Sequence, residues 1–292
     1  MTNAQELYSE YVRRLELAGV FSPQSNVRKI FAHVCGVDSE FEFSFQRVLT
    51  DAQKDRIEAC ILRREQREPL ARIFGQIDFF NVTINVDKNV FRPCFETEAL
   101  VEHVLEHATT HRPPARILDL GTGTGCLLLS LLKAFEHATG TGVDIDEAAI
   151  LSAQNNARQN GLEDRAAFLL NNWGDGLNEK FDLVIGNPPA VPSQNVRLML
   201  PEMKDHDPLI SLDGGPDGLA FYHYASRNLK GLLAPDGIGV FRCYSINVES
   251  SLFKKKGFNT EIKTDYLRQP CCLFVSHKEG TSWMERVLSL FH

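Results

Sequence analysis

The stretch Ile117–Gly125 decides the fold class of this chain; it reads Ile-Leu-Asp-Leu-Gly-Thr-Gly-Thr-Gly. Its first half, with Arg116 before it, is a short apolar segment of the kind that forms a buried parallel strand. The glycines at alternate positions can adopt backbone angles closed to other residues and let a ligand approach the main chain. An apolar run, 126–132, then opens a helix. Strand, glycine turn and helix in this order predict a cradle for a nucleotide-type cofactor.

From this stretch onward, segments typical of strands alternate with segments typical of helices. We expect strands at 117–120, 140–145, 166–170, 181–185, 237–243, 258–264 and 271–276, and helices at 126–136, 147–160, 219–232 and 248–256. This alternation predicts an α/β fold with a seven-stranded, mainly parallel sheet that helices cover on both faces. The ligand of such a sheet lies outside the carboxyl ends of the strands, where the strand order reverses.

Residues 1–75 are predicted to form a separate all-helical domain. The first helix is expected over 4–17, the second after Ser22-Pro23, and the third after a capping box at 50–53. The third helix ends in a charged tail, 63–68, which we interpret as a solvated face.

A β-hairpin is expected to join this domain to the remainder of the chain. Val82, Ile84 and Val86 alternate with polar residues, and a period of two indicates a strand pair. The predicted organisation is therefore a helical domain, a hairpin linker at 76–95 and a cofactor-binding domain at 96–292.

Composition and charge exclude several classes of protein. The 292 residues are 43% hydrophobic and 24% charged, which is ordinary for a soluble globular protein. No stretch approaches the roughly 18 consecutive apolar residues of a membrane helix, and the first residues lack the features of a signal peptide. We therefore expect a cytoplasmic protein without a membrane partner. The net charge of −7 disfavours nucleic acid as the substrate.

The cysteines and histidines give no sign of a metal site or a disulfide framework. The seven cysteines are scattered, and no two have the Cys-x-x-Cys spacing. The vicinal pair 271–272 lies in an apolar run and is interpreted as part of a packed strand. His103, His107 and His111 are four residues apart, but we interpret them as solvated histidines and predict no metal.

Carboxylates at the strand ends narrow the choice of cofactor. The turn lacks the Gly-x-Gly-x-x-Gly spacing of dinucleotide-binding folds. Asp119, two residues before the first glycine, is placed either to accept from a cationic amino group or to order the loop. Asp144 directly follows the second strand and is placed to accept from both ribose hydroxyls. Asp146 is predicted to cap the next helix.

Polar and aromatic residues follow the third and fourth strands. Asn172 and Trp173 can accept from an adenine amino group and pack on its ring, although a strand-end turn and a core aromatic are the alternative interpretations. Asn187-Pro188-Pro189 either forms a simple turn or presents two acceptors, the Asn187 side-chain carbonyl and the Pro188 backbone carbonyl. Such a pair suits a planar NH₂ group, whose delocalised lone pair needs orienting toward an electrophile.

With these motifs in place, the chain resembles the class I S-adenosylmethionine-dependent methyltransferases that modify planar nitrogens. Within them it is similar to the HemK/PrmC-type release-factor glutamine methyltransferases. The resemblance covers nearly the whole chain and rests on the following segments: Glu68-Pro69-Leu70-Ala71, Asp78-Phe79-Phe80, residues 97–102, Asp119–Gly125, Asn187-Pro188-Pro189 and Asp207-Pro208-Leu209. The helical and hairpin segments narrow it to this family, because methyltransferases share the cofactor motif widely.

The resemblance implies S-adenosyl-L-methionine as the cofactor and a Rossmann-like class I methyltransferase fold. The expected cofactor-binding residues are Asp119, Gly121, Thr122, Gly123, Gly125, Asp144, Ile145, Asn172, Trp173 and Asn187. The expected catalytic groups are Asn187 and Pro188, which would hold the acceptor nitrogen. The expected substrate-binding residues are Pro93, Phe95, Thr97, Pro189 and Ala190.

Departures from the family pattern concentrate on the acceptor side. The family usually reads Pro-Arg-Pro-Asp-Thr-Glu where this chain has Cys94 and Phe95 in place of the arginine and the second proline. Ala190 stands where a tyrosine is usual, Arg242 where an acidic residue is usual, and Asn172 where the third strand usually has an aspartate. The cofactor elements are largely kept, so the acceptor pocket is the part that we expect to differ.

Several functions therefore stay open at this stage. The first is N-methylation of a glutamine side chain of a release factor. The second keeps the cofactor but uses a small-molecule acceptor, or another reaction of the sulfonium. The third is a cofactor-binding partner protein without catalysis, which the intact 187–189 motif argues against. A nucleic-acid adenine methyltransferase comes fourth because of the charge balance and the helical domain.

Overall fold

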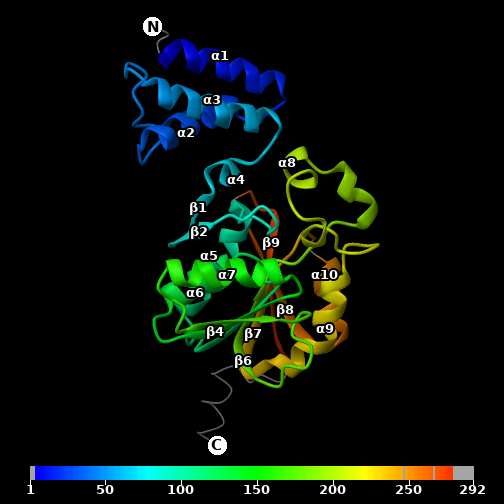
Figure 1. Ribbon diagram of the computed structural model, residues 1–292. Helices are drawn as coiled ribbons and strands as arrows, with labels where there is room; N and C mark the ends of the chain where they lie inside the picture. Colours follow the sequence, from blue (N-terminus) through cyan, green and yellow to red (C-terminus); the bar gives the residue numbers. More distant parts are fainter. Residues whose placement is uncertain (1–3, 246, 266, 279–292) are drawn as a thin grey trace, which may run out of the picture. The chain divides into compact units, whose positions relative to one another are not determined.

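A computed structural model describes residues 4–245, 247–265 and 267–278 (Figure 1). The chain divides into two compact units. One unit comprises Met1–Gln76 together with Met199–Asp207, and the other comprises Ile77–Leu198 and Pro208–His292. No helix within the described ranges is long and apolar enough to cross a membrane.

The first unit is helical. It contains α1 (Ala4–Leu17), α2 (Pro23–Cys35), α3 (Asp51–Glu65), α4 (Leu70–Phe74) and α8 (Pro201–Lys204). Apolar residues on the facing sides of α1, α2 and α3 form its core, among them Leu15, Val27, Ile30, Phe31, Ile57 and Ile61. The predicted capping box is confirmed, because the Thr50 side chain accepts from the Gln53 N–H while the Gln53 side chain accepts from the Thr50 N–H.

The charged tail of α3 is not a solvated face, so that prediction is wrong. Arg64 is only 5% exposed. Arg64 Nη2 and Arg67 Nη2 lie 2.8 and 2.7 Å from the two carboxylate oxygens of Glu202. Arg72 pairs with Asp207 at 2.8 Å, and both of these side chains are almost fully buried. The short segment 199–207, which comes from far along the chain, is thus held in the helical unit by charge pairs.

The second unit is built on a seven-stranded sheet. The hairpin strands β1 (Gln76–Phe79) and β2 (Val82–Asn85) and helix α5 (Phe95–Ala108) precede it. The strands of the sheet are β3 (Arg116–Leu120), β4 (Thr139–Asp144), β5 (Ala166–Leu170), β6 (Phe181–Gly186), β7 (Leu233–Arg242), β8 (Phe258–Thr264) and β9 (Pro270–His277). Their order is β5-β4-β3-β6-β7-β9-β8, and β9 runs antiparallel to the other six strands.

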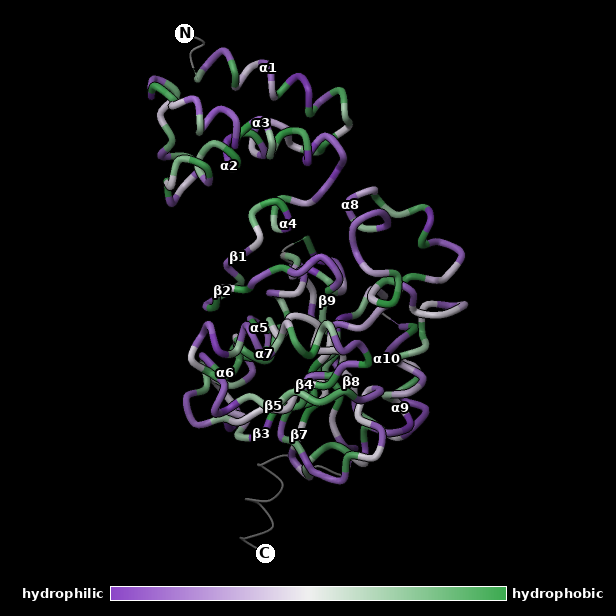
Figure 2. Tube along the Cα trace, in the orientation of Figure 1, coloured by the Kyte–Doolittle hydropathy of each residue, from purple (hydrophilic) through white to green (hydrophobic). Residues whose placement is uncertain are grey.

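Helices cover both faces of this sheet, as predicted (Figure 1). The helices are α6 (Cys126–Ala134), α7 (Glu147–Gln159), α9 (Ala220–Leu232) and α10 (Val248–Lys255), with short 3₁₀ turns at Ser193–Leu198 and Leu209–Ser211. Successive residues of β3 enter different cores: Ile117 packs with α5, α6 and α7, whereas Leu118 packs with α9 and α10. This accounts for the unbroken apolar character of the strand. Figure 2 shows hydrophobic residues along the central strands.

The order of the strands indicates which edge of the sheet binds a ligand. The chain runs outward from β3 to β4 and β5, then returns to β6 on the other side of β3. The carboxyl ends of β3 and β6 therefore flank the point where the order reverses, which is where such sheets bind ligands. The predicted α/β class with a seven-stranded, mainly parallel sheet is confirmed.

Asn156 of α7 ties the hairpin to the glycine turn. Its side chain is fully buried. The side-chain oxygen accepts from the Asn85 N–H at 2.8 Å. The side-chain nitrogen donates to the carbonyl oxygens of Thr124, at 3.0 Å, and Asn85, at 3.3 Å. One amide thus satisfies backbone groups from two segments that are distant in the sequence.

We expect Asn156→Ala to destabilise the second unit, because it leaves these buried backbone groups unpaired. Each such group costs roughly 1–3 kcal/mol, so the free energy of unfolding should fall by about 2 kcal/mol or more in urea denaturation. Asn155→Ala is the matched control, since Asn155 is exposed and its side-chain oxygen accepts from Arg158 on the same helix. Equal stability of the two variants would contradict this role of Asn156.

Candidate functional site

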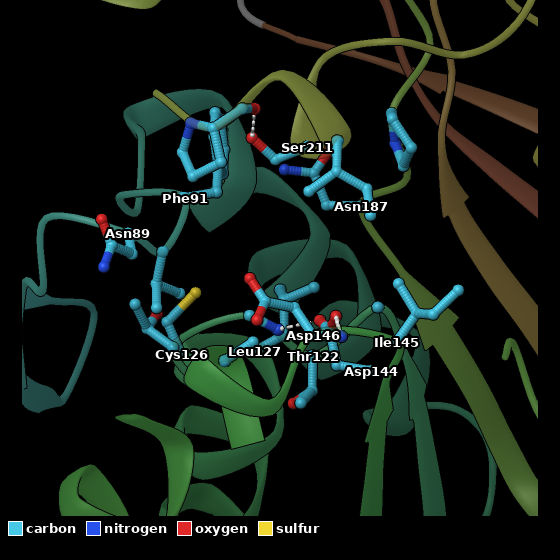
Figure 3. A pocket seen from close by; sticks show the side chains of 18 of the residues that line it. Asn89, Phe91, Thr122, Cys126, Leu127, Asp144, Ile145, Asp146, Asn187 and Ser211 are labelled. Atoms are coloured by element: carbon cyan, nitrogen blue, oxygen red, sulfur yellow. Dashed lines mark hydrogen bonds between the residues drawn. The ribbon is translucent and has the colours of Figure 1, made fainter. Parts of the chain in front are cut away.

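A pocket of about 300 Å³ opens at the carboxyl ends of β3, β4 and β6 (Figure 3). The described residues that line it are Asn89, Val90, Phe91, Pro93, Thr97, Gly121, Thr122, Gly123, Thr124, Cys126, Leu127, Asp144, Ile145, Asp146, Ala149, Asn172, Trp173, Asn187, Pro189, Pro208, Ile210, Ser211 and Asp213. All of them belong to the second unit.

The glycine turn forms the floor of this pocket. Gly121, Gly123 and Gly125 have φ angles of 75°, 55° and 81°, a region that favours glycine. A Cβ on Gly121 or Gly123 would meet nothing within 4 Å, whereas one on Gly125 would lie 3.2 Å from the Ala153 side chain. The first two glycines therefore border open space, and Gly125, which does not line the pocket, allows α6 and α7 to pack closely.

Asp144 fixes the shape of the turn. Its carboxylate accepts from the Gly123 N–H at 2.9 Å and from the Asp146 N–H at 3.0 Å. A carboxylate has about four lone-pair sites, so capacity remains for a ligand in the pocket. Burial raises the pKa of Asp144. Asp146 caps α7 by accepting from the Ala148 N–H, as predicted, and also lines the pocket.

Asp119 lies beneath the turn and does not line the pocket. Its side chain is fully buried and accepts from the Thr122 hydroxyl at 2.8 Å. Burial raises the pKa of the Asp119 carboxyl to about 7. Of the two roles considered from the sequence, this placement supports ordering of the loop, since other atoms separate the carboxyl from the pocket.

Asn172 and Trp173 line the pocket from the end of β5. Trp173 has a φ of 48°, and its ring packs edge-on against Phe221, with centroids 5.5 Å apart. It thus belongs both to the pocket wall and to the edge of the core. Asn172 donates weakly to Asp175, at 3.3 Å.

Asn187 lines the pocket from the end of β6, and a second segment orients its side chain. Its amide nitrogen donates to the Thr97 hydroxyl oxygen at 2.9 Å. Thr97 is 2% exposed, and the Cys94 sulfur lies 3.0 Å from the same hydroxyl. The predicted acceptor-side residues Pro93, Thr97 and Pro189 therefore meet Asn187 at one pocket.

Other predicted residues lie elsewhere. Pro188 is buried, and neither Pro188 nor Ala190 is among the described lining residues. The side chain of Phe95 lies outside the described part of the structure. His103 and His107 are half-buried on α5, and His107 stacks on His111. No cluster suited to a metal ion occurs among the described residues.

Three parts of the pocket wall were not foreseen from the sequence. Cys126 and Leu127 directly follow the glycine turn, and this position in the motif was a usable signal. Residues 89–91, after the hairpin, form a wall that no local pattern marks. The wall at 208–213 begins in the family segment Asp207-Pro208-Leu209, but nothing in that segment indicated a place at the pocket. They reach the pocket only through the tertiary fold.

The charges of the pocket select the kind of ligand. Asp144, Asp146 and Asp213 line it, and no lysine or arginine is among the lining residues in the described ranges. Nucleotide phosphates are normally bound by cations or by helix N-termini. The pocket includes the N-terminus of α6, but its carboxylates and its lack of cationic side chains among the described lining residues also suit a nucleoside that carries a positive charge.

Comparisons with known proteins agree with this site. Residues 82–203 match the methyltransferase small domain family, and residues 6–75 match the PrmC N-terminal domain family. The release factor glutamine methyltransferase of Agrobacterium fabrum is 36% identical over 253 residues, which cover 85% of this chain and 88% of that protein. The enzyme of the same name from Rhodospirillum rubrum is 40% identical over 226 residues, which cover 77% and 69%.

Among solved structures, the catalytic domain of hMettl16 aligns with a TM-score of 0.53 at 16% identity, over 85% of this chain and 91% of that domain. At this identity the likeness concerns the fold alone. The relatives align over both units and carry one name, so the chain belongs to the release factor glutamine methyltransferase family.

Proposed function

We propose that this protein transfers the methyl group of S-adenosyl-L-methionine to the side-chain amide nitrogen of a glutamine in a peptide chain release factor. The observation that carries the proposal is the placement of Asn187. Its amide nitrogen is occupied by Thr97, which leaves its oxygen available at the pocket as an acceptor for an NH₂ group.

The pocket fits the cofactor. The turn at Gly121 and Gly123 leaves space beside the main chain, Asp144 offers free lone pairs to ribose hydroxyls, and Trp173 supplies an aromatic wall. The absence of basic side chains among the described lining residues suits the positive sulfonium. When bound, the cofactor supplies an activated methyl group.

The protein supplies proximity and orientation. The Asn187 side-chain oxygen would accept one hydrogen of the acceptor amide, so that the nitrogen faces the methyl group. The Pro188 carbonyl, predicted as the second acceptor, belongs to a buried residue that is not among the described lining residues. Orientation of this kind contributes up to roughly 7–11 kcal/mol to lowering a barrier. No strong general base is needed if the proton leaves after methyl transfer.

A small-molecule acceptor is less well supported than a protein acceptor. Of the positions that depart from the family pattern, Cys94, Ala190 and Arg242 are not among the described residues that line the pocket. Asn172 does line it, and the side chain of Phe95 lies outside the described part of the structure. Arg242 Nη1 donates to the backbone carbonyls of Cys243 and Cys271. Cys94, Ala190 and Arg242 therefore lie behind the pocket wall and not in it.

The direct test is incubation of the protein with labelled cofactor and a release factor, followed by mass spectrometry of its glutamine residues. We expect one glutamine to gain a single methyl group on its side-chain nitrogen. Turnover of small molecules without any methylation of release factors would favour the second function. Cofactor binding without turnover on either acceptor would favour a partner protein.

Asn187→Ala is expected to lower kcat by about 100-fold, because the acceptor amide loses an orienting partner. The dissociation constant of the cofactor, measured by calorimetry, should change little. Asn195→Ala is the control, since this asparagine is exposed and does not line the pocket. A normal kcat of the Asn187→Ala variant would contradict the role of Asn187 in orienting the acceptor amide.

Asp144→Ala should weaken cofactor binding by about 10- to 100-fold, which corresponds to the loss of hydrogen bonds to a charged group. Titration with S-adenosyl-L-methionine measures this effect. Asp164→Ala, at an exposed position outside the pocket, serves as the control. Unchanged affinity of the Asp144 variant would place the ribose elsewhere.

Cofactor affinity is also expected to depend on pH through Asp119. Because the pKa of this buried carboxyl is about 7, it is neutral below that pH and ionised above it. A sulfonium in the pocket favours the ionised form, so affinity should rise as pH increases through about 7. The rise should be smaller for the product S-adenosylhomocysteine, which keeps the ammonium and carboxylate of the cofactor but has no sulfonium, and it should be absent in Asp119→Asn. A pH-independent affinity of the wild type for the cofactor would contradict the coupling.

A further inference from the structure

The side chain of Asn187 belongs to a chain of three side chains at the start of α5. The Asn187 amide nitrogen donates to Thr97 Oγ1 at 2.9 Å, and Cys94 Sγ lies 3.0 Å from the same oxygen. Cys94 is the N-cap residue of α5, and the Thr97 N–H donates to the Cys94 carbonyl at 2.9 Å. One helical turn therefore holds the hydroxyl and its sulfur partner, while Asn187 reaches the hydroxyl from the end of β6.

The orientation of the Asn187 amide decides what it offers to the pocket. A side-chain amide has an acceptor end and a donor end of nearly the same shape. Only the orientation with Oδ1 toward the pocket can accept from the NH₂ group of an acceptor amide. The reverse orientation would present a second NH₂ group to the first, and no hydrogen bond would form.

Thr97 alone does not decide between these orientations. A hydroxyl has one hydrogen and two lone pairs, so it can accept from the asparagine nitrogen or donate to the asparagine oxygen. If the hydroxyl hydrogen is directed to Cys94, the oxygen keeps only lone pairs for Asn187. The amide must then turn its nitrogen toward Thr97, as the structure shows.

We propose that Cys94 and Thr97 are positioning residues that select the reactive orientation of the Asn187 amide. The sulfur takes the hydroxyl hydrogen, the hydroxyl oxygen takes an amide hydrogen, and Oδ1 is directed to the pocket. The inference deepens the proposed function and rests on it. It also gives a role to Cys94, which stands where the family pattern has an arginine.

The surroundings keep this arrangement rigid. The Thr97 side chain is 2% exposed, and the next turns of α5 pack into the core through Leu100, Val101 and Val104. On the other side, Pro188 restricts the backbone of Asn187. Loss of the hydroxyl therefore leaves an amide that is free to rotate about its last bond while its backbone stays in place.

The test compares Thr97→Val, which keeps the shape of the side chain and removes the hydroxyl, with Thr97→Ser, which keeps the hydroxyl. We expect Thr97→Val to lower kcat for release-factor methylation by about 10- to 100-fold, the effect of one unpaired buried group. Thr97→Ser should recover most of the loss, and the dissociation constant of the cofactor should stay near the wild-type value in both. Cys94→Ala should lower kcat less than Thr97→Val does.

A second measurement does not depend on activity. In protein labelled with ¹⁵N-asparagine, the side-chain amide signals of Asn187 are identified by their loss in Asn187→Ala. Their exchange with solvent should be slow in the wild type and in Thr97→Ser, and faster by about tenfold or more in Thr97→Val. Thr109→Val is the control, because that hydroxyl donates to the Glu106 carbonyl at the far end of the same helix.

The outcomes separate this inference from the proposed function. A folded Thr97→Val protein with wild-type kcat and unchanged amide exchange overturns the positioning role. Equal losses in Thr97→Val and Thr97→Ser also overturn it, since they point to packing and not to the hydroxyl. If the wild type does not methylate release factors, the proposed function fails, and the exchange measurement still decides whether Thr97 holds the amide.

Discussion

The turn between β3 and α6 depends on three positive φ angles, and much of the second unit depends on that turn. Only glycines adopt such angles without strain at alternate positions, and Gly121, Gly123 and Gly125 do so. Asp144 holds the turn from the adjacent strand through the Gly123 N–H. Because Gly125 has no side chain, α7 can approach closely enough for Asn156 to reach the Thr124 carbonyl.

The contact between Asn156 and the Thr124 carbonyl links the glycine turn to the hairpin. Asn156 also binds both backbone groups of Asn85, and the chain that leaves the hairpin supplies the pocket wall at 89–93 and then Thr97. The floor of the pocket and the segment that orients Asn187 are thus fixed by one buried amide. In this protein the hairpin is part of the site's framework and more than a linker.

The sequence allowed the sheet and the floor of the pocket to be predicted, because their signals are local. Apolar strands, alternating glycines and residues at strand ends such as Asp144 and Asn187 are read from neighbours in the chain. The buried state of Arg64 could not be predicted this way, since its partner Glu202 is 138 residues away. Thr97 was expected at the acceptor side only through the family resemblance, and its hydrogen bond to a residue 90 positions later could not be read from local patterns.

Departures from the family pattern can also suggest the wrong role for a residue when only the sequence is considered. Cys94, Ala190 and Arg242 stand out against the family pattern and suggested a rewritten acceptor pocket, yet none of them is among the described lining residues. Ala190 instead packs its backbone against a glycine loop, where a Cβ on Gly218 would lie 2.5 Å from its carbonyl oxygen. Cys94 contacts the Thr97 hydroxyl and so affects Asn187 only indirectly. In this chain these positions differ from the family pattern while Asn187-Pro188-Pro189 is kept, which fits the proposal that the constraint falls on the orientation of Asn187 and not on the residues that achieve it.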